Sequence, residues 1–320
     1  MNITERIDAK YLSLIQSALD NALPNSHLLS PKTLRAVRNA QQTTITPPEN
    51  IVIDNEIVVT AQREINIRVY RQTQQTEQNT PVLIFLHGGG FVVGNLDTHQ
   101  GTCIRFCKDT SWPVISVDYR LAPEHPFPAA TDDCYDVLCW VSQQQERLKI
   151  DPARIAIVGE SAGGNLATVT ALMARDRNGP LPAFQLLFYP VTDCNFTNPS
   201  YVNYRDGPLL TASQMEAYWS YYLNGEKTTD NPYAAPLRAN TLKGMPPTAI
   251  VTAEFDVLRS EAEAYAVRLK AEGVAIQEFR AEGIIHGFMK HVETHPEANR
   301  IYIAARNSMT LALKINTEES

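Results

Sequence analysis

The sequence lacks a long hydrophobic run, an excess of positive charge and a secretion signal. No stretch of about 18 consecutive apolar residues occurs, which argues against a membrane-spanning helix. The formal net charge is −7, so neither nucleic acid nor an anionic membrane surface is an expected partner. The first residues lack the apolar core of a signal peptide, and we therefore predict a cytoplasmic protein.

Metal-binding patterns are also missing. Cys103 and Cys107 lie four residues apart in a predicted helix, where we expect small buried side chains rather than a redox pair. His291 and His295 have the same spacing, but the residues between them do not match a zinc-binding helix, and Pro296 follows. We predict no metal and no cofactor.

What the sequence does contain is an alternation of apolar strands and helices. The fractions of hydrophobic and charged residues, 44% and 20% of 320 residues, are ordinary for a globular protein. Continuous apolar strands alternating with helices predict an α/β fold, with a mostly parallel sheet that helices cover on both faces. Such a sheet binds its ligand at the carboxyl ends of its strands. Predicted strands cover 82–87, 114–117, 155–158, 184–189, 248–252 and 274–279, and predicted helices cover 99–109, 129–145, 162–175, 260–271 and 297–314.

Three regions stand outside this alternation. Two β-branched runs, 51–59 and 64–71, predict an antiparallel hairpin at a sheet edge. Before them, residues 3–19 and 30–42 read as amphipathic helices, the second capped by Ser30. After the fourth strand of the alternation, residues 192–247 show no strand pattern but many aromatic side chains, and so long an interval is usually functional.

These regions define the predicted domains. We expect N-terminal cap helices in 1–48, a main α/β domain in 49–191 and 247–320, and a second cap segment in 192–246. The aromatic residues of the second cap segment either wall an apolar pocket or pack on the core.

A candidate nucleophile lies between the strand 155–158 and the helix 162–175. The stretch Gly159-Glu-Ser-Ala-Gly163 fits the pattern Gly-x-Ser-x-Gly, in which a tight strand-to-helix turn exposes the serine oxygen. The glycines avoid collisions with the neighbouring strand and helix. The helix that follows directs its N-terminal N–H groups toward developing negative charge. Ser161 is therefore the predicted nucleophile.

A glycine-rich loop follows the strand 82–87. Gly88, Gly89 and Gly90 would let the backbone turn its N–H groups toward a pocket and hold an oxyanion, together with the N–H group of Ala162. A plain turn is the alternative for such a loop. A phosphate loop is a second alternative, but no Gly-Lys-Ser/Thr follows. We expect His87 to orient the loop rather than to transfer a proton.

A serine hydroxyl needs a base and the base needs an orienting acid. His286 is the one histidine that follows a late predicted strand and has a glycine beside it. In the chain order Ser, acid, His, the acid falls between 161 and 286. Asp256 lies in the loop after the strand 248–252 and is the favoured acid, while Glu254 is the alternative.

In combination these stretches resemble the hormone-sensitive-lipase family of α/β-hydrolases, in particular its bacterial carboxylesterases and acetyl-ester hydrolases. The resemblance implies Ser161, Asp256 and His286 as a triad and Gly89, Gly90 and Ala162 as oxyanion donors. The matching stretches are His87-Gly-Gly-Gly-Phe91, Asp118-Tyr-Arg-Leu-Ala-Pro-Glu-His-Pro-Phe-Pro-Ala129, Gly159-Glu-Ser-Ala-Gly-Gly-Asn-Leu166, Ala235-Pro-Leu-Arg238, Asp256-Val-Leu-Arg259 and His286-Gly-Phe288.

The resemblance further implies a cap built from the N-terminal helices and the insertion after Tyr189, and a buttress in 118–124. The chain departs from the family at one motif: where the family commonly has Asp-Pro-Leu-Arg-Asp-Glu, Val257 and Ser260 replace the proline and the second aspartate. This change affects the loop and leaves the triad acid in place.

The predicted function is hydrolysis of short- to medium-chain carboxylic esters through an acyl-serine. An amidase, formamidase or lactonase with the same triad is the first alternative, and a receptor without chemistry is the second. We predict that Phe91, Tyr189, Tyr204 and Leu210 line the substrate pocket. The expected partner is a small ester, and a homodimer is left open.

Overall fold

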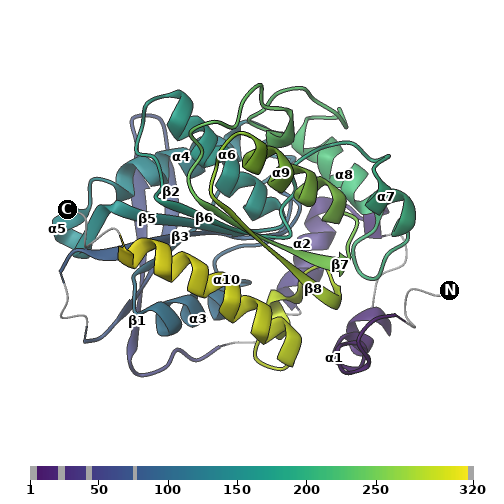
Figure 1. Ribbon diagram of the computed structural model, residues 1–320, viewed down its shortest axis with the longest axis horizontal. Helices are drawn as coiled ribbons and strands as arrows, with labels where there is room; N and C mark the ends of the chain where they lie inside the picture. The colour runs from purple at the N-terminus through teal and green to yellow at the C-terminus, as the bar shows by residue number, and fades with distance from the viewer. Residues whose placement is uncertain (1–5, 21–25, 41–44, 75–77, 316–320) are drawn as a thin grey trace.

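The computed structural model describes residues 6–20, 26–40, 45–74 and 78–315. Eight strands form one sheet in the order β1-β2-β4-β3-β5-β6-β7-β8, with α3 and α10 on one face and α4, α6 and α9 on the other (Figure 1). The strands are β1 (Ile51–Val59), β2 (Glu64–Gln72), β3 (Thr80–Leu86), β4 (Val114–Val117), β5 (Ile150–Glu160), β6 (Phe184–Phe188), β7 (Thr248–Phe255) and β8 (Ile276–Ile285).

The helices alternate with these strands as the apolar pattern predicts. They are α1 (Ala9–Asp20), α2 (Pro31–Ala40), α3 (Gln100–Thr110), α4 (Ala129–Val141), α5 (Gln145–Leu148), α6 (Ala162–Asp176), α7 (Pro199–Asn203), α8 (Ala212–Tyr222), α9 (Arg259–Ala271) and α10 (Pro296–Ile315), with short 3-10 turns η2 (Ser26–Leu28), η3 (Pro236–Arg238) and η4 (Phe288–His291).

The predicted sheet is confirmed. The hairpin β1–β2 is antiparallel, and β2 pairs antiparallel with β4 at one side of the sheet. All pairings from β4 to β8 are parallel. Every residue of β3, β4 and β6 is buried, as expected for strands that helices cover on both faces. The carboxyl ends of these parallel strands therefore meet at one edge of the sheet.

Several predicted boundaries are wrong, among them the start of β5 at Ile150 instead of residue 155, and three of them have an identifiable cause. The strand expected to end at residue 279 continues to Ile285, because β7 is also longer than predicted and carries β8 beside it as far as Phe255. The helix expected over 129–145 ends at Val141, where the hydroxyl of Ser142 donates to the carbonyl of Cys139 at 2.7 Å and takes up a helix-end acceptor.

The third wrong boundary is at the N-terminus. The helix expected over 3–19 begins at Ala9, because the carboxylate of Asp8 accepts hydrogen bonds from the N–H groups of Lys10 and Tyr11, both at 3.0 Å, and so caps it. Residues 3–5 lie outside the described residues. The predicted apolar face is present where it is described, since Ile7, Tyr11 and Ile15 are buried.

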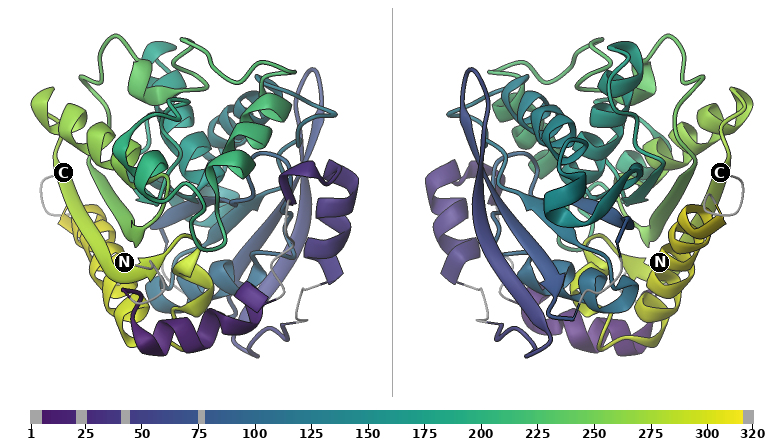
Figure 2. Two further views of the ribbon diagram at one scale, coloured as in Figure 1. Left: turned by 90° about the vertical axis from the view of Figure 1, so that its right-hand side faces the viewer. Right: turned by 90° about the vertical axis from the view of Figure 1, so that its left-hand side faces the viewer.

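The N-terminal helices and the insertion after β6 lie outside the crossovers of the sheet. Figure 2 shows the purple helices α1 and α2 on the outside of the molecule. The 3-10 turn η2 contacts α8, which belongs to the insertion. The insertion contains the helices α7 and α8 and no strand of the sheet. Two segments far apart in sequence therefore meet beside the sheet.

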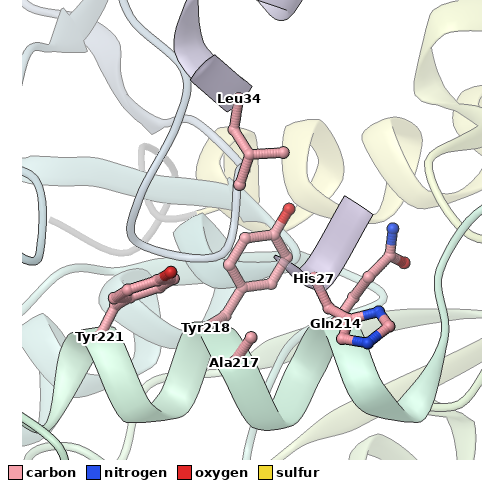
Figure 3. Close-up of a pocket in the computed structure, with 6 residues that line it drawn as sticks. All are labelled: His27, Leu34, Gln214, Ala217, Tyr218 and Tyr221. Carbon is pink, nitrogen blue, oxygen red and sulfur yellow. The ribbon is translucent and has the colours of Figure 1, made fainter. Parts of the chain in front are cut away.

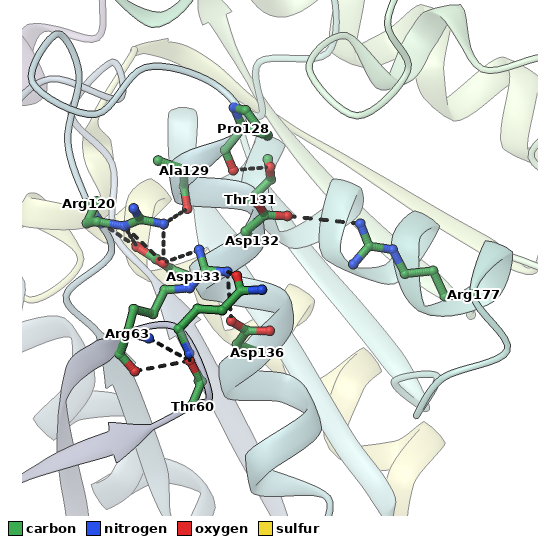
Figure 4. A network of polar contacts seen from close by, with 11 residues as sticks. Thr60, Arg63, Arg120, Pro128, Ala129, Thr131, Asp132, Asp133, Asp136 and Arg177 are labelled. Atoms are coloured by element: carbon green, nitrogen blue, oxygen red, sulfur yellow. Dashed lines mark hydrogen bonds and ion pairs between the residues drawn. The ribbon is translucent and has the colours of Figure 1, made fainter.

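The stretch 118–124 is tied down by a buried carboxylate. Asp133 of α4 accepts bonds from the backbone N–H, Nε and Nη2 of Arg120 at 2.9 to 3.1 Å, and Nη1 of Arg63 lies 3.3 Å away (Figure 4). Two guanidinium groups on one carboxylate form a strong, directional contact.

Among the described residues, no helix is long and apolar enough to span a membrane.

Candidate active site

Ser161 lies at the sharp turn where β5 ends and α6 begins. Its φ of 55° and ψ of −122° are strained for a residue with a side chain. The turn has room only for glycine on both sides. A Cβ atom on Gly163 would lie 2.0 Å from the carbonyl oxygen of Leu86, and one on Gly159 would lie 2.1 Å from that of Gly163. The sequence pattern therefore produces the tight turn that it predicts.

The loops after β7 and β8 bring two more side chains to this turn. Nε2 of His286 lies 3.0 Å from Oγ of Ser161, and Nδ1 lies 2.7 Å from Oδ2 of Asp256. Asp256 is buried, and its Oδ1 accepts a hydrogen bond from the N–H group of Leu258 at 2.9 Å. The three predicted triad residues thus form one hydrogen-bonded row, with the hydroxyl at one end and a fixed carboxylate at the other.

Glu254, the alternative acid, has a different set of partners. Its Oε1 accepts a hydrogen bond from Arg6 at 2.9 Å, and its Oε2 accepts one from the N–H group of Gly283 at 2.8 Å. Both contacts tie the N-terminal segment and β8 to the end of β7. The carboxylate of Glu254 is thereby directed away from the imidazole of His286.

The glycine loop lies beside the turn that carries Ser161. Gly89 and Gly90 have φ values of 130° and 60°, which favour glycine. Among the described residues, no backbone acceptor is found for the N–H groups of Gly89, Gly90 and Ala162, so these donors are available to a ligand. Gly88 lies directly against Glu160, since an added Cβ atom would be 3.2 Å from its Oε1.

His87 holds the base of this loop. Its Nδ1 donates to the carbonyl oxygen of Gly88 at 2.8 Å, and its ring stacks on that of Tyr119, whose hydroxyl donates to the His87 carbonyl at 2.7 Å. Burial lowers the pKa of His87 to about 3, so the ring is neutral. A neutral, fully buried ring suits the orienting role that we expect of it.

The four predicted pocket residues have dissimilar surroundings. Phe91 is fully buried and stacks on Tyr222 with ring centroids 3.9 Å apart. Tyr189 is buried against the imidazole of His286. Tyr204 stands edge-on to Phe255, next to the loop that carries the acid, and Leu210 is partly buried against the core.

Sequence reasoning missed the specific position of Tyr218. A Cβ atom on Gly90 would lie 2.4 Å from the Tyr218 ring, so this ring covers the glycine loop. Tyr218 also lines a shallow surface crevice between η2, α2 and α8 (Figure 3). The aromatic content of 192–247 indicated such a role for the segment as a whole. The residues that line the crevice are His27, Leu34, Gln214, Ala217, Tyr218 and Tyr221.

The described residues contain no group of three or more His, Cys, Asp or Glu side chains arranged to hold a metal ion. The imidazoles of His291 and His295 both contact the Tyr11 ring in edge-on geometry, and Nε2 of His295 lies 2.9 Å from Oδ1 of Asp8. Their spacing of four residues thus anchors the N-terminal helix.

The chain is similar to known proteins along most of its length. The profile of the alpha/beta hydrolase fold family matches residues 83–290, which include the glycine loop and the loops of the acid and the histidine. The chain belongs to the α/β-hydrolase fold family. Its resemblance to the hormone-sensitive-lipase branch of this family is confirmed by relatives along most of the chain.

Two curated relatives of this α/β-hydrolase are esterases by name. Esterase LipI of Mycobacterium tuberculosis is 39% identical over 254 residues, which are 78% of each chain. Ethyl acetate hydrolase of Pseudomonas putida is 39% identical over 226 residues, which are 70% of this chain and 71% of that protein.

Solved structures agree with the α/β-hydrolase assignment along nearly the whole chain. A thermostable esterase from Pseudomonas putida has a TM-score of 0.85 and 33% identity, and the match covers 97% of both chains. A fungal esterase from Rhizomucor miehei has a TM-score of 0.91 and 29% identity, covering 98% of this chain and 99% of the other.

Proposed function

We propose that this α/β-hydrolase cleaves short- to medium-chain carboxylic esters, with Ser161 as nucleophile, His286 as general base and acid, and Asp256 as the orienting carboxylate. The observation that carries the proposal is the row of two hydrogen bonds, 2.7 and 3.0 Å long, that links the three side chains. Relatives along most of the chain are esterases by name, which supports the ester bond as the target.

In this mechanism His286 accepts the proton of Ser161 as its oxygen attacks the ester carbonyl. The carboxylate of Asp256 holds the Nδ1–H of the imidazole and stabilises the imidazolium that forms. His286 then donates the proton to the leaving alcohol. Water, activated by the same imidazole, attacks the acyl-serine, and the carboxylic acid is released.

The N–H groups of Gly89, Gly90 and Ala162, with Gly88 completing the loop, are the proposed oxyanion hole. Each donor is fixed by the backbone before the substrate arrives, so no reorganisation is needed as charge develops on the carbonyl oxygen. Losing one such donor typically costs about 3 kcal/mol of transition-state stabilisation. The positive φ values of Gly89 and Gly90, which glycine adopts without strain, thereby serve the reaction.

The cap is proposed to consist of residues 1–48 and 192–246, above a catalytic domain of residues 49–191 and 247–320. The ring of Tyr218, which covers Gly90, bounds the space beside the oxyanion hole and favours small acyl groups. Tyr204 and Leu210 are the proposed contributions of the second cap segment to the pocket wall, and Phe91 and Tyr189 are those of the catalytic domain, supported for Tyr189 by its contact with His286.

A cytoplasmic location is also proposed. All five cysteines are free, as suits a reducing compartment, and cell fractionation would test the location.

The decisive experiment compares the wild-type protein with Ser161→Ala on p-nitrophenyl esters of increasing chain length. We expect wild-type turnover to peak at short chains, and the folded variant to fall to the background rate. Substantial turnover by the variant contradicts the assignment of the nucleophile. Matched ester, amide and lactone substrates separate an esterase from an amidase, formamidase or lactonase, and labelling of Ser161 by a fluorophosphonate excludes a receptor without chemistry.

A further inference from the structure

Glu160 directly precedes the proposed nucleophile, and its buried carboxylate has two partners. Oε1 accepts a hydrogen bond from Nε2 of His99 at 2.8 Å, and Oε2 accepts one from the hydroxyl of Tyr189 at 2.9 Å. Burial alone would raise the pKa of Glu160, but the hydrogen bond and charge of His99 and the bond from Tyr189 outweigh it and lower the pKa to about 2. The carboxylate is therefore ionised at neutral pH.

The imidazole of His99 is held on both sides. Its Nδ1 lies 2.8 Å from the hydroxyl oxygen of Thr98, which is itself bonded to the carbonyl oxygen of Asn95 at 2.8 Å. On the other side Nε2 donates to Glu160. The buried carboxylate therefore accepts hydrogen bonds from two rings whose positions are fixed.

The second partner of Glu160 reaches the proposed base. The ring of Tyr189 packs against the imidazole of His286, with centroids 4.6 Å apart and planes at 58°. It also stands edge-on to Phe288 at 5.2 Å. Since the hydroxyl of Tyr189 is bonded to Glu160, the ring is fixed at both ends, and the imidazole has a rigid wall on one side.

The same carboxylate also contacts the glycine loop. A Cβ atom on Gly88 would lie 3.1 Å from the carbonyl oxygen and 3.2 Å from Oε1 of Glu160, so the two residues pack closely. The ring of His99 stacks on that of His87, the residue that holds the base of the loop, with centroids 5.3 Å apart. Glu160 thus lies between the base, the nucleophile and the oxyanion donors.

We infer that Glu160 is a positioning residue. Through Tyr189 it fixes the imidazole of His286 against Ser161. Through Gly88 and His99 it fixes the distance between the oxyanion loop and Ser161. This inference rests on the proposed function, because it assigns Glu160 and Tyr189 to the geometry of that reaction. It requires no contact between either residue and the substrate.

The test removes one oxygen atom. Tyr189→Phe keeps the ring beside His286 but loses the bond to Glu160. We expect kcat on p-nitrophenyl butyrate to fall roughly 10- to 100-fold while KM changes less than about threefold, because small displacements of reacting groups slow chemistry more than binding. The rate at which a fluorophosphonate labels Ser161 should fall by the same factor as kcat.

Tyr302→Phe is the matched control. Tyr302 is also fully buried and donates to a carboxylate, that of Asp109 at 3.0 Å, but it lies in α10 and contacts no triad residue. We expect a similar loss of thermal stability in both variants and normal kcat only in the control. Equal kcat in the two variants would overturn the inference.

A second substitution tests whether Glu160 and Tyr189 act through the hydrogen bond between them rather than through a general loss of structure. Glu160→Met should lower kcat at least as much as Tyr189→Phe, and the double variant should be no slower than Glu160→Met alone, because methionine leaves the hydroxyl of Tyr189 without its carboxylate acceptor and both changes therefore break the same bond. Additive losses would refute the link. Ser161→Ala, assayed in parallel, distinguishes the hypotheses: an active Ser161→Ala variant contradicts the proposed function, whereas an inactive one beside a fully active Tyr189→Phe contradicts only this inference.

Discussion

Asp133 in α4 and Glu160 at the end of β5 are both buried carboxylates, but their partners differ in kind. Asp133 binds Arg120 and Arg63, whose guanidinium groups stay charged at any pH the protein meets (Figure 4). Glu160 binds an imidazole and a phenol. The first contact fastens two chain segments to each other and the second aligns rings around a reacting group.

This difference corresponds to what each carboxylate does. Asp133 attaches the stretch 118–124 to α4, and its bidentate arginine contact does so in one fixed geometry. The region behind Ser161 contains a carboxylate whose two oxygens accept hydrogen bonds from His99 and Tyr189, and these bonds fix the position of the Tyr189 ring beside His286. Substitutions in the scaffold should therefore change stability, and substitutions near Ser161 should change turnover.

The largest expected effect comes from Asp256→Asn. The amide fills the same space but cannot hold the Nδ1–H of His286, so the wrong tautomer faces Ser161. We expect kcat to fall about 10⁴-fold. The midpoint of thermal unfolding should change little. Steady-state kinetics and a melting curve on the same preparation check both statements, and a loss of stability without a loss of kcat would reverse the distinction between site and scaffold.

Asp133→Asn is the scaffold counterpart. Removing a fully buried charge leaves Arg120 and Arg63 without their shared partner, and we expect the free energy of unfolding to fall by about 3 kcal/mol. The kcat of the remaining folded protein should stay within about threefold of wild type. Urea denaturation followed by circular dichroism measures the first quantity, and active-site titration corrects the second. A large drop in kcat at full occupancy would show that this clamp also positions the site.

The sequence predicted the residues that short local patterns and chain order identify. Ser161 and its glycines occur within five residues, and Asp256 and His286 each follow an apolar strand, so pattern and order were enough to select them. The sequence could not reveal the bond from His99 to Glu160, because the two residues are 61 positions apart and meet only in the folded protein.

Some predicted helix and strand boundaries were wrong for a similar reason. Residues 280–285 of β8 do not alternate clearly, and they become strand because β7 extends beside them. The start of α1 depends on Asp8, which also bonds to His295 at the other end of the chain. The departure at Ser260 was visible, but its consequence was not: its hydroxyl lies 2.6 Å from that of Ser200 and links α9 to α7. Such long-range partners are specified by tertiary structure alone.

A third buried carboxyl group, that of Glu261, differs from that of Asp133 because it forms no ion pair with a described residue. Its Oε1 accepts N–H bonds from Thr192 and Asp193 at 2.8 and 3.3 Å, while Oε2 has no partner among the described residues. Burial raises its pKa well above the usual value of 4.5. As pH rises above 4.5, the unfolded chain releases this proton while the folded protein retains it, so the free energy of unfolding falls with rising pH in this window.

Glu261→Gln should remove this dependence, because an amide does not titrate and its carbonyl can still accept both N–H bonds. Within the window, wild-type stability should decline relative to the variant by at most about 1.4 kcal/mol per pH unit. Urea midpoints of both proteins at pH 5, 6, 7 and 8 give the difference, in which all other titrating groups cancel. Parallel pH profiles would mean that Glu261 is already ionised in the folded protein.

The smallest expected effect belongs to Glu254, the carboxylate that sequence order left as the alternative acid. Its partner Arg6 is half exposed, and a salt bridge of that kind contributes about 0.5 kcal/mol. Glu254→Gln keeps an oxygen for the N–H group of Gly283, so the free energy of unfolding should fall by less than about 1 kcal/mol and kcat should stay within about twofold. Arg6→Gln removes the same salt bridge from the other side and should give an equal, non-additive loss. A fall in kcat approaching that of Asp256→Asn would instead mean that Glu254 orients the imidazole during turnover, and the assignment of site and scaffold carboxylates at the ends of β7 and β8 would have to be exchanged.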